Sequence, residues 1–213
     1  MRPEGLAAVL FDWDGTLVDS AEVSFRSFSR LFESYGIAFD RDAFARTYSP
    51  NWIVTYRALG LPERDWPEAD ARWVALYREE WSALLPGARD ALRLLGEHGK
   101  ALGLVTSGDR DRVRGELQRL GLDRLFGAVV CGQDVVERKP HPEGLLLALD
   151  RLACTAAEAA YVGDSPEDIE MARAAGALSV GIPGPFPNRE ALVASRPDRL
   201  AASITEATRM LLA

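Results

Sequence analysis

Short apolar runs alternate with longer amphipathic stretches along most of this chain of 213 residues. Strands that are buried on both faces form continuous apolar runs, and the stretches between them show helical periodicity. This alternation is typical of parallel strands joined by crossover helices. It predicts an α/β fold with a doubly wound, mostly parallel, Rossmann-like sheet. Strands are expected at residues 7–11, 101–105, 128–131, 159–162 and 178–182, and helices at 88–98, 110–120, 143–152, 166–175 and 205–212.

The stretch from residue 20 to residue 84 interrupts this pattern. It contains no convincing strand, and its apolar side chains recur at helical spacing. Aromatic side chains at such spacing usually pack against one another. We therefore predict a small helical domain, residues 20–84, inserted into a core domain formed by residues 1–19 and 85–213. The tryptophans expected in the core of the inserted domain are Trp52, Trp66, Trp73 and Trp81.

Charge and composition limit the classes of partner. The formal net charge of -7 argues against a nucleic-acid partner, because a phosphate backbone requires a clustered basic surface. No apolar stretch approaches the length of a membrane span, so no membrane partner is expected. Two cysteines are too few for a disulfide framework. The chain is expected to be cytoplasmic.

The first predicted strand is followed by the sequence DWDGT, residues 12–16. Residues two apart on an extended chain point to the same side, so Asp12 and Asp14 could present two carboxylates to one site. Adjacent carboxylates without a neighbouring histidine or cysteine favour a cation with oxygen ligands, Mg²⁺ before Zn²⁺. Acidic residues are also common in plain turns. The whole pattern is specific, since chance would produce it about once in a thousand chains of this length.

Residues that can bind an anion follow the second and third predicted strands. Thr106 and Ser107 precede a predicted helix, where hydroxyls and free amides form an anion site, although such residues are often simple helix caps. Lys139 is one of only two lysines among 25 basic residues, and Pro140 and Pro142 stiffen its loop. A lysine binds phosphate as a compact point charge. The alternative for Lys139 alone is a solvated surface position.

Acidic residues also follow the fourth predicted strand, in the sequence GDSPED, residues 163–168. Asp164 or Ser165 could simply cap the next helix, which would explain one acidic residue but not its pairing with Asp168. Ligands of open parallel sheets bind at the carboxyl ends of the strands. Carboxylates at this strand end would face those at the first and complete the oxygen shell of a cation. The four strand ends together predict one site for a metal ion and a phosphate group.

These motifs resemble those of the haloacid dehalogenase-like (HAD) hydrolase superfamily, most closely its phosphoglycolate phosphatase-like branch. The motifs that match are DxDGT at residues 12–16, Thr106 after a strand, Lys139 before a proline, and GDSxxD at residues 163–168. The resemblance covers nearly the whole chain, because the helical insertion lies where that branch carries its cap domain. It implies an HAD core with a helical cap and a Mg²⁺-dependent phosphatase. The substrate would be a small phosphate monoester, either phosphoglycolate-like or a sugar phosphate.

The same resemblance implies a function for each site residue. Asp12 would be the nucleophile that forms an aspartyl-phosphate, and Asp14 would be the general acid and base. Mg²⁺ would be held by the Asp12 carboxylate, the Asp14 backbone carbonyl and Asp164. Asp168 would orient the water ligands of the cation. The residues expected to bind the phosphoryl oxygens are Thr106, Ser107 and Lys139.

Other branches of the superfamily differ at positions that can be checked in this chain. Dehalogenase members lack the second aspartate of the first motif, so Asp14 argues against dehalogenation. Phosphonatase members use a cap lysine, and residues 20–84 contain no lysine. β-Phosphoglucomutase-like members carry a histidine where this chain has Ser24, which argues against mutase chemistry but not against a sugar phosphate. A pyrophosphatase, a β-phosphoglucomutase-like enzyme and a non-catalytic phosphate-binding regulator remain as alternatives.

Substrate choice in this branch depends largely on the cap. Residues 48–52 form a turn-like stretch between helical segments, and they are either the loop that reaches the active site or a plain surface turn. Arg26, Arg46 and Arg57 could pair with a substrate carboxylate if they face inward. The sequence leaves the substrate and the oligomeric state open.

Overall fold

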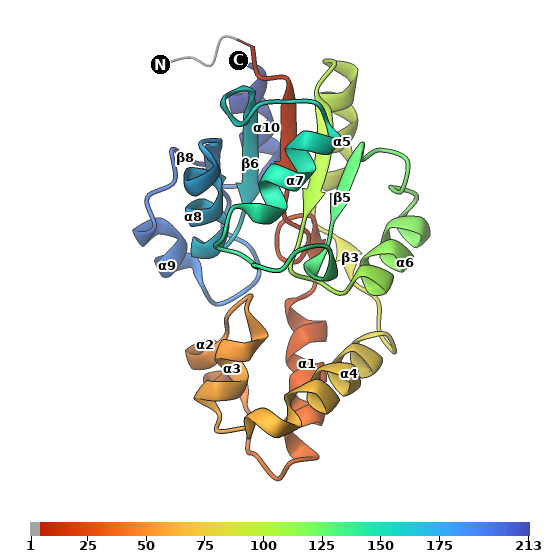
Figure 1. Ribbon diagram of the computed structural model, residues 1–213, viewed down its shortest axis with the longest axis vertical. Helices are drawn as coiled ribbons and strands as arrows, with labels where there is room; N and C mark the ends of the chain where they lie inside the picture. Colours follow the sequence, from red (N-terminus) through yellow and green to blue (C-terminus); the bar gives the residue numbers. More distant parts are fainter. Residues whose placement is uncertain (1–4) are drawn as a thin grey trace.

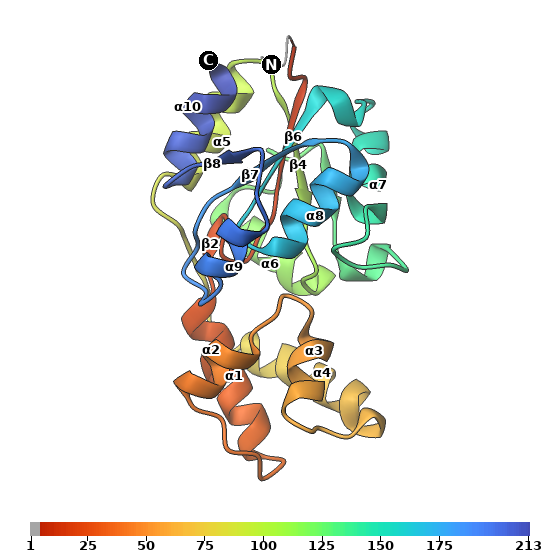
Figure 2. The same ribbon diagram turned by 90° about the vertical axis from the view of Figure 1, so that its left-hand side faces the viewer.

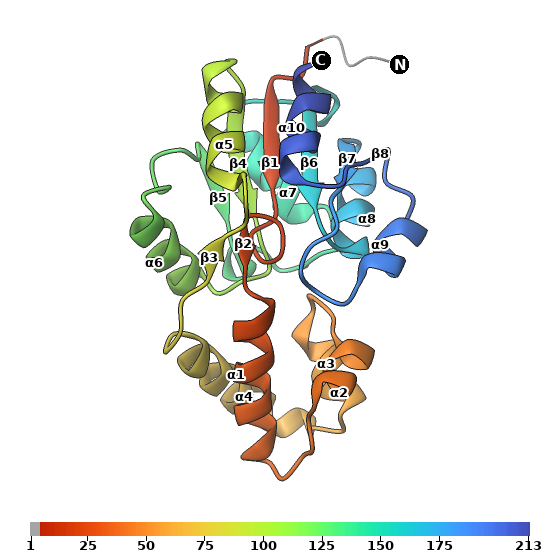
Figure 3. The same cartoon turned by 180° about the vertical axis from the view of Figure 1, so that it is seen from behind.

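The computed structural model of the protein describes residues 5–213. Its main sheet consists of β1 (Ala8–Phe11), β4 (Ala101–Val105), β5 (Ala128–Val130), β6 (Ala159–Gly163), β7 (Leu178–Gly181) and β8 (Arg199–Leu200). All six strands are parallel, in the order β5-β4-β1-β6-β7-β8 (Figure 3). β1 lies between β4 and β6. After β1, the chain first forms β4 and β5 on one side of it and then β6, β7 and β8 on the other side. The carboxyl end of β1 is the switch point at which such sheets bind ligands.

Helices cover both faces of this sheet (Figures 1 and 3). One face packs against α5 (Ala88–Glu97), α6 (Arg110–Leu120) and α10 (Ile204–Leu212), and the other against α7 (Glu143–Arg151) and α8 (Pro166–Ala175). The short helix α9 (Arg189–Ala194) precedes β8, and single 3-10 turns lie at Glu63–Asp65, Gly132–Asp134 and Ala156–Glu158. β1 and β6 are buried along their whole length, which explains their continuous apolar sequences.

A separate group of helices lies beyond the carboxyl ends of the strands (Figure 2). It consists of α1 (Ala21–Glu33), α2 (Arg41–Thr47), α3 (Trp52–Ala58) and α4 (Trp66–Tyr77). The chain connects it to the sheet through an antiparallel ribbon of β2 (Val18–Asp19) and β3 (Ala83–Leu84). We propose these connections as the domain boundaries, after residue 19 and before residue 85; residues 1–4 lie outside the described residues. We refer to this helical group as the cap.

The predicted elements agree closely with the structure. β4, α6 and α8 begin and end at the predicted residues, and every other predicted element differs by one residue at one end. The sequence analysis missed β2, β3, α9 and β8. The expectation of no strand within residues 20–84 is wrong at Ala83–Leu84, because two residues are too few to show an alternating pattern.

The cap core is aromatic, as predicted, but it excludes one of the four tryptophans. Trp52, Trp66 and Trp73 pack around a buried cluster that includes Phe32. Trp81 is 57% exposed and lies beneath the guanidinium of an arginine of α6. Within residues 5–213, no helix has both the length and the apolar character required to cross a membrane.

Candidate active site

Lys139 lies at the centre of the site and uses all three of its protons. Its ammonium group donates to Asp12 Oδ1 at 2.6 Å, to the Tyr161 hydroxyl at 2.7 Å and to Asp168 Oδ1 at 2.7 Å. The fold supplies these groups from the end of β1, from β6 and from the first turn of α8. Lys139 is only 7% exposed, so the alternative of a solvated lysine is wrong. The sequence analysis did not single out Tyr161, because it lies within a continuous apolar strand.

Asp168 has a clear structural function in addition to its contact with Lys139. Its Oδ2 accepts hydrogen bonds from the backbone N–H and the hydroxyl of Ser165, at 3.1 and 2.8 Å, while the Ser165 hydroxyl accepts from the Asp168 N–H. This reciprocal pair is a capping box at the start of α8. Both oxygens of Asp168 therefore have partners. The structure ties Asp168 to Lys139 and Ser165, and the expectation that it orients water on a cation stays a prediction.

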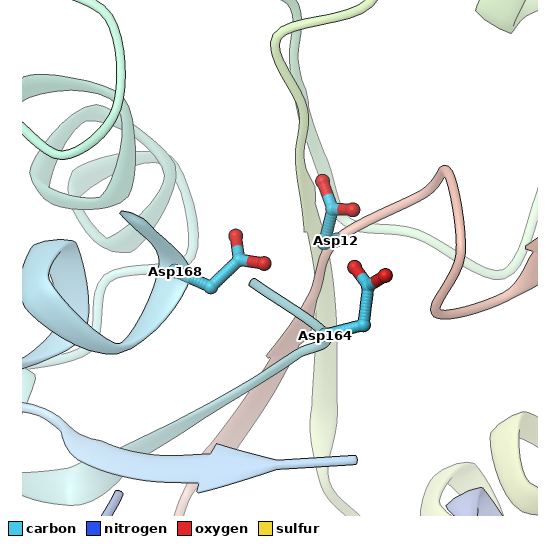
Figure 4. A group of neighbouring side chains, drawn as sticks. All are labelled: Asp12, Asp164 and Asp168. Atoms are coloured by element: carbon cyan, nitrogen blue, oxygen red, sulfur yellow. The ribbon is translucent and has the colours of Figure 1, made fainter. Parts of the chain in front are cut away.

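Three buried carboxylates, those of Asp12, Asp164 and Asp168, converge at this site (Figure 4). One oxygen from each lies within 4.8 Å of the others. Asp164 Oδ2 is buried, and it has no hydrogen-bond partner within the described residues. A buried carboxylate oxygen without a partner is costly unless a cation or a donor satisfies it. The arrangement fits a divalent cation with oxygen ligands, held chiefly by Asp12 and Asp164.

The pKa values of these carboxyls reflect the same crowding. Burial raises the pKa of Asp12 to about 7, with a further increase from the charges of Asp168 and Asp14, against the lowering effect of Lys139. Burial and the charge of Asp12 raise the pKa of Asp164 well above its ordinary range. Negative charge is thus in excess at this strand end, and a bound cation would relieve it.

Gly15 permits the close approach of the first and fourth motifs. Its φ of +84° is in the region that favours glycine, and a Cβ at this position would collide with Asp164 Oδ2. The chain therefore turns out of β1 directly against the carboxylate expected to bind the cation. This explains why DxDGT requires glycine at its fourth position.

Asp14 lines the same cavity as Asp12, but its carboxylate has different partners. Arg112 of α6 donates to both of its oxygens, at 2.6 and 3.1 Å. Arg112 also bonds Glu116 at 3.0 Å, and Glu116 accepts from the indole N–H of Trp13 at 2.7 Å. The cap approaches Asp14 through the Tyr77 hydroxyl, 3.5 Å away. Strand alternation does not apply to Asp14, because β1 ends at Phe11.

Sequence reasoning missed the pair of Arg112 and Glu116, although a signal was present. The two residues lie four apart on α6, next to the buried Val113 and Leu117. A predicted helix that places opposite charges on its apolar face indicates a buried ion pair. In the structure Arg112 also pairs with Asp14, whose carboxylate lines the cavity.

Thr106 and Ser107 lie at the end of β4 and line the cavity. Thr106 is buried, and its hydroxyl oxygen accepts from the Gly108 N–H at 3.0 Å. The N-cap of α6 is Asp109, which accepts from the Arg112 N–H at 2.9 Å. The alternative that Thr106 or Ser107 caps this helix is therefore wrong. Their positions remain compatible with binding phosphoryl oxygens beside Lys139.

Residues 48–52 reach the cavity, and four of them line it: Tyr48, Ser49, Pro50 and Trp52. The Tyr48 ring stacks on Phe186 of the core at 4.3 Å, and the Ser49 hydroxyl donates to Glu167 Oε1 at 3.2 Å. These contacts exclude the alternative of a plain surface turn.

The three cap arginines that could have met a substrate carboxylate face solvent. Arg26 pairs with Glu80 and with another glutamate, Arg57 pairs with Glu63, and Arg46 is exposed. Within the described residues, none of the three lines the cavity.

Comparisons with known proteins identify relatives of this chain. A family model described as haloacid dehalogenase-like hydrolase matches residues 9–182. A phosphoglycolate phosphatase of Yersinia pestis is 33% identical, over 95% of this chain and 92% of that protein. Pyrophosphatase PpaX of Bacillus pumilus is 31% identical, over 97% and 96%. The structure of CbbY from Rhodobacter sphaeroides in complex with xylulose-(1,5)bisphosphate has a TM-score of 0.77 at 28% identity, covering 94% of this chain and 96% of that one.

Proposed function

Because the chain belongs to the haloacid dehalogenase-like hydrolase family and is a phosphatase, we propose that it hydrolyses a small phosphate monoester with Mg²⁺. The substrate is phosphoglycolate-like or a sugar phosphate, and the reaction passes through an aspartyl-phosphate on Asp12. The observation that carries this proposal is the buried contact between Lys139 and Asp12, at the switch point of the sheet. This contact supports the proposal because both side chains line one cavity, in which Asp12 would be the nucleophile and Lys139 a cation for the phosphate.

In the first step, an oxygen of Asp12 attacks phosphorus, and the bond between phosphorus and the ester oxygen breaks. Lys139 favours the ionised form of Asp12, against the effect of burial. Asp14 would give a proton to the departing alcohol and then accept one from the water that hydrolyses the aspartyl-phosphate. As a proton donor, its carboxyl would have to leave the ion pair with Arg112 and carry a proton when the ester is bound. Inorganic phosphate leaves, and Asp12 returns to its free form. Thr106, Ser107 and Lys139 hold the phosphoryl oxygens during both steps.

The cation would be held by the carboxylates of Asp12 and Asp164 and by the backbone carbonyl of Asp14. Bound there, Mg²⁺ would neutralise charge on the phosphoryl group. The buried, unpartnered oxygen of Asp164 supports this assignment. We assign Asp168 to the positioning of Lys139, since both of its oxygens accept hydrogen bonds.

Pyrophosphate is the second candidate substrate, because PpaX matches the chain over almost its whole length. Mutase chemistry is disfavoured, since Ser24 lines the cavity where mutase-like members carry a histidine. A non-catalytic regulator would bind phosphate without turnover. We also propose a cytoplasmic location, and a small phosphate ester as the ligand.

Phosphate release tests the proposal directly. The substrates are phosphoglycolate, sugar phosphates, nucleotides, pyrophosphate and p-nitrophenyl phosphate, each with Mg²⁺ and then with EDTA. We expect release that requires the metal, and its loss in Asp12→Asn with the protein still folded. Turnover by Asp12→Asn at a near-normal rate would exclude the proposed nucleophile.

A further inference from the structure

The cap side of the cavity carries one charged side chain within the described residues, that of Asp70 on α4. Asp70 is half-buried and makes no hydrogen bond or ion pair with another residue of the 5–213 range. Burial raises its pKa, against the lowering effect of Arg138. A carboxylate in such a position is an acceptor that lacks a donor.

Two donors belong to residues that line the same cavity. The Nε1 atom of Trp73 is buried and has no hydrogen-bond partner in the described part of the chain, and Trp73 lines the cavity. Arg138, directly before Lys139 in the sequence, also lines the cavity, and its guanidinium lies 5.6 Å from the centre of the Trp52 ring. Its side chain forms no ion pair with any residue of the described range. The two donors, the acceptor and the indole rings of Trp52 and Trp73 thus belong to residues that line one cavity.

We propose that Asp70, Trp73, Arg138 and Trp52 form a subsite for the alcohol part of the substrate, and that this alcohol is a polyol. The enzyme would then hydrolyse a sugar phosphate or polyol phosphate. This inference rests on the proposed phosphatase function and selects between the substrate classes it leaves open.

The chemistry of the subsite selects a hydroxyl-rich ligand. A hydroxyl donates one hydrogen bond and accepts two, so neighbouring hydroxyls can satisfy Asp70, Trp73 and Arg138 together. The apolar C–H faces of a sugar also pack well against indole rings. A substrate carboxylate could pair with Arg138, but it only accepts hydrogen bonds, so it would leave Asp70 without a donor in the same cavity. A quaternary ammonium group would compete with Arg138, whose guanidinium already lies over Trp52.

Selectivity among esters tests the subsite by turnover. We would measure kcat/KM for pentose and hexose monophosphates, phosphoglycolate, phosphocholine and a nucleoside monophosphate in the wild type, Asp70→Ala and Glu68→Gln. Glu68 is an exposed residue of the same helix and serves as the matched control. We expect a sugar phosphate to be the best substrate and Asp70→Ala to lower its kcat/KM by about 10- to 100-fold relative to phosphoglycolate. A better rate with phosphoglycolate, phosphocholine or the nucleotide, or an equal loss on all esters, would overturn the subsite.

Binding to Asp12→Asn separates this inference from the phosphatase function. Quenching of tryptophan fluorescence, with Mg²⁺ present, would report sugar phosphate and inorganic phosphate at the cavity. Tighter binding of the sugar phosphate, lost on adding Asp70→Ala, supports the subsite even if the wild type releases no phosphate. Equal binding of the two ligands refutes the subsite even if the wild type is an active phosphatase.

Discussion

Replacing Asp168 by asparagine tests whether a buried charge network, rather than Lys139 alone, holds the active site together. The exchange preserves shape but removes the negative charge 2.7 Å from the Lys139 ammonium. It also presents an amide N–H₂ to Lys139 or to the Ser165 N–H, so one donor loses its acceptor. Removing one partner of a buried ion pair costs roughly 3–5 kcal/mol. Lys139 keeps Asp12 and Tyr161, so we expect a loss near the lower limit, about 3 kcal/mol.

For a chain of this length, 3 kcal/mol lowers the melting temperature by roughly 6–12 °C. Asp168→Asn should also hold Lys139 less firmly. We expect kcat to fall on the order of 10²-fold, because a small displacement of a catalytic group strongly lowers the rate. Thermal unfolding and phosphate release, measured on the same preparations, give both values. The control is Glu170→Gln, an exposed carboxylate on the same helix. A melting temperature within 2 °C of the wild type, or kcat within about threefold, would refute the network.

Three further predictions follow from the same contacts. Burial raises the pKa of Asp12 to about 7 and that of Asp164 well above its ordinary value, so the metal-free folded state binds more protons than the unfolded state. The stability of the metal-free protein should fall as pH rises from about 4 to 7. Saturating Mg²⁺ should raise the free energy of unfolding by about 2–3 kcal/mol, and by more at pH 7.5 than at pH 5. A melting temperature in EDTA that rises over this pH range would contradict this. Gly15→Ala should weaken Mg²⁺ activation at least tenfold through its clash with Asp164, whereas Gly36→Ala, also at positive φ but with open space around it, should not; equal Mg²⁺ titrations of the two variants would count against the argument. Arg112→Met should destabilise the fold by about 3–5 kcal/mol, because it leaves two carboxylates without their cation; an unchanged urea midpoint would show that the ion pairs contribute nothing.

Much of the core could be predicted from sequence because its signals are local. A strand buried on both faces is apolar throughout, and a helix end has its own residues, such as Gly121 after α6. The elements that were missed depend on partners far along the chain. β2 and β3 have two residues each, and they form a ribbon only because the fold brings them together.

For the candidate site, the sequence predicts which residues lie together but not which partners they bond. The positions of Asp12, Lys139 and Asp164 follow from the rule that strand ends share one edge of a parallel sheet. The partners of these residues did not follow, since a hydrogen bond between Lys139 and Tyr161 depends on the register of β6 beside β1. The orientation of Asp14 toward Arg112 depends on how α6 packs. Packing also decides which cap side chains face the cavity. Of the described residues, Asp70 lines it, whereas none of the three candidate arginines does.

The charges around the nucleophile link the cation to the substrate. Five carboxylates meet two cations in this network, an excess of three negative charges if all are ionised: Asp12, Asp14, Glu116, Asp164 and Asp168, with Arg112 and Lys139. A phosphate ester brings further negative charge, so the site without a metal repels its own substrate. A divalent cation removes most of the excess before the ester arrives. The affinity for the ester should therefore depend on Mg²⁺ even in Asp12→Asn, where no phosphoryl group is transferred.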